Sequence, residues 1–204
     1  MKPIDDLAAR AGFDACYLLP PDKFTEYELR RSDGVLHREA QNLACDPGEA
    51  APWANALLLL LMAYRPYPPE AGVSGYYSAS NRAYHGANRL AGLLTDAGVR
   101  SERIYVPVRE LSLRSGIGIA CKNGLTAYDG FGTRVIAQTL AVNLPEPVYE
   151  PVRPRRACPA CGRCETACPA RAIDRTGYRY ATERESSAGS DFAPPSFPNR
   201  VSFR

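Results

Sequence analysis

The sequence has no long apolar run. Its longest, Ala56 to Ala63, is far shorter than the roughly 20 residues that a membrane-spanning helix needs. Residues 1–12 form a polar amphipathic stretch, whereas a secretory signal has an apolar core. With only two histidines in the chain, neither a Ser-His-Asp triad nor a Cys-His dyad can be placed. We therefore expect a cytoplasmic protein without a membrane span and without such a nucleophile.

An excess of one charge sign is also missing. The chain has 25 Lys and Arg against 22 Asp and Glu, a net charge of +3, which is too small to indicate a nucleic-acid-binding protein. Its 204 residues and 45% hydrophobic content suffice for one ordinary core plus a small appendage.

The cysteines, by contrast, are concentrated. Four of the seven form the run Cys158, Cys161, Cys164 and Cys168, followed by Pro169. This C-x2-C-x2-C-x3-C-P spacing is that of bacterial ferredoxins, in which thiolates hold a [4Fe–4S] cluster. A structural zinc site more often shows two separated C-x2-C pairs, and disulfides are rare in the cytoplasm. The run therefore predicts an iron–sulfur site with these four cysteines as metal ligands.

The spacing leaves alternatives for the fourth ligand. In two-cluster ferredoxins the last cysteine of such a run binds the other cluster, and the sequence shows no second run. Either Cys168 completes a lone cluster, or Cys16, Cys45 or Cys121 does so from the preceding domain. A site with only three irons or a labile cluster is a further alternative.

Hydrophobic periodicity and Gly/Pro positions predict the elements. Helices are expected at Ile4 to Ala11, 24–31, Leu36 to Leu43, Tyr76 to Thr95 with Gly98 as the stop, and Arg109 to Ser115. Strands are expected at Phe13 to Leu19, Ala56 to Ala63 as a buried central strand, and Ile104 to Val108, while Thr133 to Val142 fits either type. The pattern predicts an α/β (α+β) N-terminal domain over 1–148 and a ferredoxin-like iron–sulfur module over 149–180. Residues 181–204 have the composition of a disordered tail.

Three further stretches, together with the cysteine run, carry a resemblance to a known family. They are Asn81 to His85, Arg109 to Leu125 with the sequence RELSLRSGIGIACKNGL, and Tyr128 to Arg134. Their order resembles the epoxyqueuosine reductase family and its shorter relatives, in which "D-Y-H", "A-G-L-G-x-x-G-K-N-x-L" and "E-Y-G" elements precede the ferredoxin cysteines. The resemblance covers roughly residues 50–175.

The resemblance implies an N-terminal domain that holds cobalamin beside a ferredoxin-like domain that supplies electrons. Lys122 and Asn123 lie on a glycine-flanked loop, where they either bind the cofactor or form a turn with a solvated lysine. Tyr84 and His85 either line the same pocket or, in the case of His85, form a hydrogen bond at a helix start. A protein of ferredoxin or flavodoxin type is the candidate redox partner. A tRNA is a partner only if the reductase activity is retained. The sequence departs from the family at Cys121, where the family has glycine, and at Ala83, where it has an acid. The family's second cysteine run is also missing, which fits a short relative or a reading frame that changes after about Gly177.

Two hypotheses follow from the sequence. In the first, the chain is an oxidoreductase-like protein that passes electrons from a [4Fe–4S] cluster to cobalamin or a substrate in the N-terminal domain. In the second, it is a ferredoxin-like electron carrier or docking module without an active site of its own. Addition of cobalamin distinguishes them, because only the first predicts a corrin complex.

Overall fold

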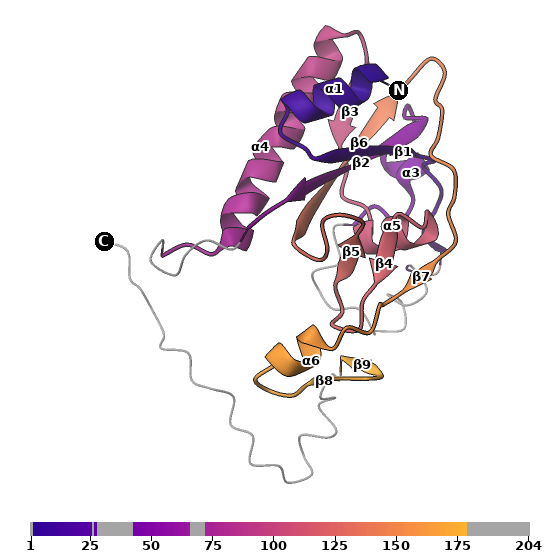
Figure 1. Ribbon diagram of the computed structural model, residues 1–204. Coiled ribbons are helices and arrows are strands. Elements are labelled where there is room, and N and C mark those ends of the chain that lie inside the picture. The colour runs from indigo at the N-terminus through magenta and orange to yellow at the C-terminus, as the bar shows by residue number, and fades with distance from the viewer. Residues whose placement is uncertain (1, 26, 28–42, 66–71, 179–204) are drawn as a thin grey trace.

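The structure is a computed structural model that describes residues 2–25, 27, 43–65 and 72–178 (Figure 1). Its centre is a four-stranded sheet in the order β1-β2-β6-β3, in which every neighbouring pair is antiparallel. These strands are β1 (Ala15–Leu19), β2 (Ala56–Ala63), β3 (Arg100–Arg103) and β6 (Val135–Asn143).

Strand β2 is apolar throughout because both of its faces are covered. Successive side chains of a strand point to opposite faces. Leu58 and Leu60 accordingly belong to one hydrophobic core, and Leu57, Leu59 and Leu61 belong to a second one. All five side chains are fully buried. The prediction of a buried central strand at Ala56–Ala63 is confirmed.

Two helices cover one face of the main sheet. They are α1 (Lys2–Arg10) and α4 (Gly75–Asp96), and Figure 1 shows them side by side on that face. Helix α4 faces the sheet with small residues at four-residue spacing, Ala79, Ala83 and Ala87, followed by Leu90 and Leu94. Small side chains let the helix lie close to the strands.

The other face carries the short helix α5 (Val108–Arg114) and a three-stranded sheet in the order β5-β4-β7. The strands are β4 (Gly118–Ala120), β5 (Thr126–Tyr128) and β7 (Arg156–Ala157). Strand β5 is antiparallel to β4, whereas β7 is parallel to it. The short helix α3 (Pro47–Ala50), capped by the Asp46 carboxylate, precedes β2.

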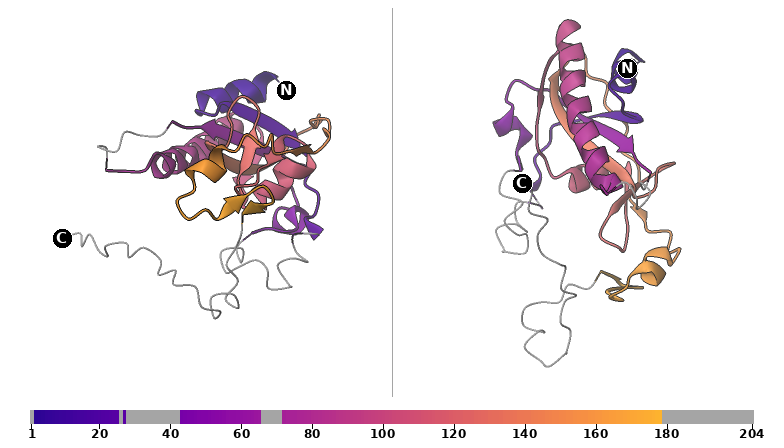
Figure 2. Two further views of the ribbon diagram at one scale, coloured as in Figure 1. Left: turned by 60° about the horizontal axis from the view of Figure 1, so that its bottom comes forward. Right: turned by 90° about the vertical axis from the view of Figure 1, so that its left-hand side faces the viewer.

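The cysteine run lies in a small segment beyond β7. It contains α6 (Arg163–Ala167) and the two-stranded sheet of β8 (Ile173–Asp174) and β9 (Gly177–Tyr178). Figure 1 and the right-hand view of Figure 2 place this segment at the end of the described chain nearest β4 and β5 and away from α1. The small strands β4 and β7 therefore connect it to the rest of the fold.

The structure confirms a mixed α/β fold with antiparallel sheets. Residues Thr133 to Val142, left open between strand and helix, form strand β6. The strand expected at Ile104 to Val108 is wrong: the ladder to β6 is formed by Arg100–Arg103, and Pro107 caps α5. A proline has no N–H to donate to a ladder and fits a helix start.

Some predictions fall outside the described residues. These are the helix at Leu36 to Leu43, most of the helix at 24–31, and the tail 181–204. The domain boundaries at 148 and 180 stay predictions. Within the described part of the chain, no helix combines the length and apolar character needed to cross a membrane.

Candidate functional site

The cysteine run follows β7 directly, so the small sheet positions it. Cys158 is the first residue after the strand, Cys164 lies in α6, and Cys168 is the C-cap of that helix. Between them the backbone turns sharply at Ala160 (φ 53°) and Gly162 (φ 72°). Left-handed backbone at a residue with a side chain is uncommon and costs free energy. Tight turning between closely spaced cysteines is what a run that folds around a metal cluster requires.

Backbone N–H groups point at two of the sulfurs. The Cys158 sulfur accepts hydrogen bonds from the N–H groups of Lys122 and Ala160, and these bonds lower the pKa of the thiol. The Cys168 sulfur accepts one from the N–H of Ala172 at 3.3 Å. Such donors stabilise thiolates, which are the form that binds metal. They are also among the contacts by which proteins tune iron–sulfur clusters.

The donor set fits an iron–sulfur cluster in its chemistry. All seven cysteines are free thiols, and those of the run are partly or fully exposed. Among the residues that the structure describes, however, no three His, Cys, Asp or Glu side chains are gathered as metal ligands. The assignment of Cys158, Cys161, Cys164 and Cys168 as ligands therefore stays a prediction.

A fifth cysteine lies beside the run. Strand β4 pairs in parallel with β7 so that Ala120 is opposite Ala157, and the residues that directly follow the two strands are Cys121 and Cys158. The two side chains form a hydrogen bond with each other. Burial, followed by the proximity of Cys158, raises the pKa of Cys121. The register thus brings together two cysteines that are far apart in the sequence.

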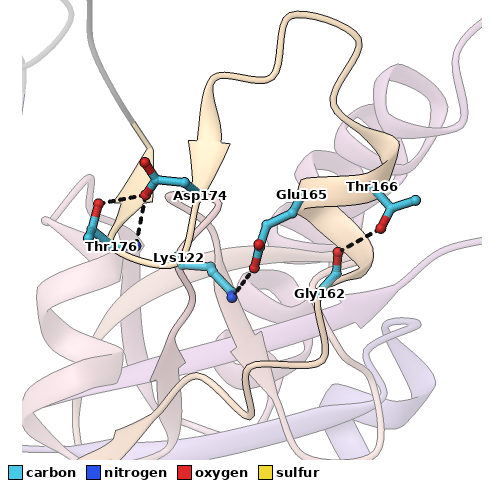
Figure 3. A network of polar contacts seen from close by, with 6 residues as sticks. All are labelled: Lys122, Gly162, Glu165, Thr166, Asp174 and Thr176. Atoms are coloured by element: carbon cyan, nitrogen blue, oxygen red, sulfur yellow. Dashed lines mark hydrogen bonds and ion pairs between the residues drawn. The ribbon is translucent and has the colours of Figure 1, made fainter.

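Lys122 joins the same site through its side chain as well as its backbone. Its ammonium forms an ion pair with Glu165 of α6 (Figure 3), and only 11% of its side chain is exposed. The hydrogen bond with Glu165 raises the pKa of Lys122, and the nearby Cys158 and Cys164 sulfurs add to this rise. The predicted cofactor-binding lysine therefore contacts the cysteine segment.

The neighbouring Asn123 braces the loop between β4 and β5. Its Oδ1 accepts a hydrogen bond from the N–H of Leu125 at 3.1 Å, which is an Asx turn. The Arg109 guanidinium donates to the Gly124 carbonyl at 2.7 Å, and the Cys121 N–H donates to the Leu125 carbonyl at 3.0 Å. The loop that carries Cys121 and Lys122 is consequently held from both ends.

Tyr84 and His85 lie elsewhere. Both belong to α4, which packs on the face of the main sheet opposite to α5. The Tyr84 ring stacks against the Arg103 guanidinium at 4.1 Å, and His85 lines a cleft of about 400 Å³ together with Asp14 and Arg89. The described residues thus do not bring this pair together with Lys122 and Asn123. Ala83, where the resembled pattern has an acid, is fully buried against the sheet.

The sequence did not reveal two of the partners in this site. Glu165 lies between two cysteines of the run, where nothing marks it as the partner of a distant lysine. The contact of Cys121 with Cys158 depends on the register of β4 and β7, which are three and two residues long. Strands this short leave no periodicity to detect. The one available signal was the cysteine itself, at a position where the resembled family has glycine.

Comparison with known proteins identifies solved structures only. No protein-family model matches the sequence, and no curated protein does. An epoxyqueuosine reductase crystallised with an epoxyqueuosine-modified tRNA-Tyr stem loop is 20% identical with a TM-score of 0.65, over 87% of this chain and 54% of that one. The epoxyqueuosine reductase from Bacillus subtilis is 20% identical with a TM-score of 0.63, over the same shares of the two chains.

A catabolic reductive dehalogenase in complex with 3-bromo-4-hydroxybenzoic acid is also similar. It is 16% identical with a TM-score of 0.52, over 84% of this chain and 25% of that one. This chain thus spans about half the length of the reductases and a quarter of the dehalogenase. The resemblance to epoxyqueuosine reductases is confirmed at the level of the fold.

Proposed function

We propose that this chain is an iron–sulfur redox protein of epoxyqueuosine-reductase-like fold. Cys158, Cys161 and Cys164 hold a [4Fe–4S] cluster together with a fourth thiol, and electrons pass from it to a cofactor or substrate in the N-terminal domain. The observation that carries this proposal is the pair of contacts that Lys122 makes with the cysteine run. The N–H of Lys122 donates to the Cys158 sulfur and its ammonium pairs with Glu165, so the two parts of the chain meet at the cluster ligands.

When bound, the cluster supplies single electrons at a potential that the protein adjusts. The contribution of this chain is to hold the thiolates and to place charge near them. Backbone N–H groups favour the thiolate of Cys158, and the Lys122 ammonium acts in the same direction. Donors and cations near the sulfurs stabilise the more negative, reduced state of such a site.

Cobalamin is the leading cofactor for the N-terminal domain. The support comes from the similar structures: one reductive dehalogenase structure suggests a mechanism for B12-dependent dehalogenation. A tRNA substrate is the corresponding extension from the reductase solved with a tRNA stem loop. Both enter only as proposals, because this chain covers 54% of the reductase and 25% of the dehalogenase.

A second candidate function is an electron carrier that docks a redox partner and has no active site of its own. It is favoured by the position of the residues expected to bind the cofactor. Lys122 is engaged by Glu165, whereas Tyr84 and His85 lie on α4 across the main sheet. A carrier of this kind needs only the cluster and an accessible face around it.

The first test is chemical analysis of the anaerobically purified and reconstituted protein. We expect about four irons and four acid-labile sulfides per chain, as in a complete cubane. Addition of hydroxocobalamin, followed by gel filtration, then separates the two candidate functions. A corrin spectrum that elutes with the protein supports the reductase-like function, and its absence with an intact cluster supports the carrier. A chain that holds no iron contradicts both.

A further inference from the structure

We propose that Cys121, and not Cys168, is the fourth thiolate ligand of the cluster. This inference rests on the proposed function, because it concerns the ligands of the same cluster. The cluster would then be bonded to two parts of the chain. Cys121 would bind it from the loop after β4, and Cys158, Cys161 and Cys164 would bind it from the segment after β7.

The spacing of the run leaves a place for such a ligand. In two-cluster ferredoxins the first three cysteines of such a run bind one cluster, and the fourth binds a different one. If the run in this chain follows the same pattern, the cluster at Cys158, Cys161 and Cys164 takes its remaining ligand from outside the run. This chain has three cysteines outside it: Cys16, Cys45 and Cys121.

The structure separates these three cysteines clearly. Cys16 lies in β1 and packs against the core under α1 and α4, across the main sheet from the small sheet. Cys45 is buried, with 8% of its surface exposed, next to α3. Cys121 is partly exposed and directly follows β4, the strand that pairs with β7. Only Cys121 among them is placed beside the run.

The pairing of the two strands fixes the position of Cys121. Ala120 and Ala157 form the last pair of the parallel ladder, and Cys121 and Cys158 directly follow them in the two chain segments. The two thiols are in hydrogen-bond contact. The loop after Cys121 is braced by Arg109. A ligand on such a preorganised loop needs little reordering to bind metal.

Cys168 has a different environment. It ends α6, and its sulfur accepts the Ala172 N–H within its own segment. In the sequence it is the fourth cysteine of the run, which in two-cluster ferredoxins does not bind the cluster of the first three. When Cys121 binds iron, its thiol releases a proton to solvent and an iron–sulfur bond forms, so that no oxidant or reductant is involved.

The experiment compares the full-length chain with Cys121→Ser, Cys168→Ser and the control Cys16→Ser after anaerobic reconstitution. Iron and sulfide are measured per chain, and the oxidised proteins are examined by EPR for a three-iron cluster. We expect Cys121→Ser to fall from about four irons to about three or fewer, while the other two variants keep about four. Four irons in Cys121→Ser, or a loss of iron in Cys168→Ser, overturns the inference.

A second measurement avoids the risk that a variant fails to fold. The loaded natural chain is alkylated with iodoacetamide, and each cysteine peptide is quantified by mass spectrometry. Protection of Cys121 together with labelling of Cys168 supports the assignment, and the reverse pattern, or equal labelling of the two, overturns it. If the natural chain takes up no iron, the proposed function itself fails, which is a distinct outcome from four irons with an unprotected Cys121.

Discussion

At the scale of single residues, the clearest electrostatic feature outside the site is the thiol of Cys16. Burial, with smaller contributions from the Asp5 and Glu150 carboxylates, raises its pKa from the ordinary 9.0 to about 12. The folded state therefore keeps the proton over a range of pH in which the unfolded chain has lost it. Stability from this group is fully present below pH 9 and is lost as the pH rises toward 12.

This shift predicts a pH dependence that one substitution removes. Between about pH 8 and about pH 10.5, the natural chain should lose about 2 kcal/mol more unfolding free energy than Cys16→Ala, since each pH unit between the two pKa values is worth about 1.4 kcal/mol. Urea unfolding of both chains at the two pH values measures the difference. Equal losses in the two chains would show that Cys16 ionises alike in the folded and unfolded states.

Lys122 gives a second prediction at this scale. The pKa of Cys158 is lowered first by the backbone N–H groups of Lys122 and Ala160 and, more weakly, by the Lys122 ammonium. Lys122→Ala keeps the backbone donor and loses the cation. In cluster-free protein at neutral pH, we expect alkylation of Cys158 to slow by about two-fold, because less of it is thiolate.

The matched control for this prediction is Lys122→Arg, which retains a cation in reach of Glu165. Its Cys158 should react at the rate of the natural chain. The rates come from mass spectrometry of the Cys158 peptide after timed exposure to iodoacetamide. Faster labelling in Lys122→Ala would mean that the lysine shields the thiol instead of activating it.

At the scale of elements, the sequence predicted a strand correctly where burial leaves a hydrophobic pattern, and missed one where it does not. Strand β2 was identified because both of its faces are buried, which leaves a continuous apolar run. Strand β3, with the sequence RSER, is an edge strand with exposed Arg100 and Glu102, so no apolar residue marks it. Hydrophobic pattern instead favours the apolar residues that follow, Ile104 to Val108, which connect β3 to α5 and enter its first turn. Edge strands are polar because one side of them faces water.

Gly116 makes the junction between elements possible. It has φ +70°, and a Cβ placed there would lie 2.2 Å from the carbonyl oxygen of Arg153. The N–H of Arg153 donates to the Ser115 carbonyl at 3.0 Å, so the segment leading to β7 runs directly against this turn. A side chain at Gly116 must displace that backbone. Gly116→Ala should therefore destabilise the fold by about 2 kcal/mol or more.

Gly92→Ala is the control for this substitution. Gly92 lies in α4, and a Cβ placed there would meet no other atom within 4 Å. Alanine in an exposed helix interior is favoured over glycine by up to about 1 kcal/mol, so this variant should be at least as stable as the natural chain. Thermal unfolding of both variants tests the pair. A Gly116→Ala protein as stable as Gly92→Ala would mean that the backbone at Arg153 can move away from the new side chain at little cost in free energy.

At the scale of the whole molecule, the cysteine segment is held by a few polar contacts. Strand β7 pairs with β4, the Lys122 ammonium pairs with Glu165, and Arg156 donates to both carboxylate oxygens of Asp129 at 2.7 Å. No residue of α6 is buried. The cysteine run itself is visible in the sequence. The contacts that hold it are not, because they join residues 27 to 43 positions apart. A register between distant short strands is a tertiary property that local patterns do not encode.

This attachment predicts that the segment loosens independently of the main fold. In the double variant Lys122→Ala/Arg156→Ala, amide hydrogen exchange in Ala157 to Cys168 should become about ten-fold faster or more, because local opening costs less than global unfolding. Exchange in β2 and β6 should not change, since their protection comes from two buried cores. Arg163→Ala, at an exposed position of α6, should leave both regions as they are. If β6 loses protection together with the segment, the two form one cooperative unit, and the N-terminal part of the chain depends on the cysteine segment for its own stability.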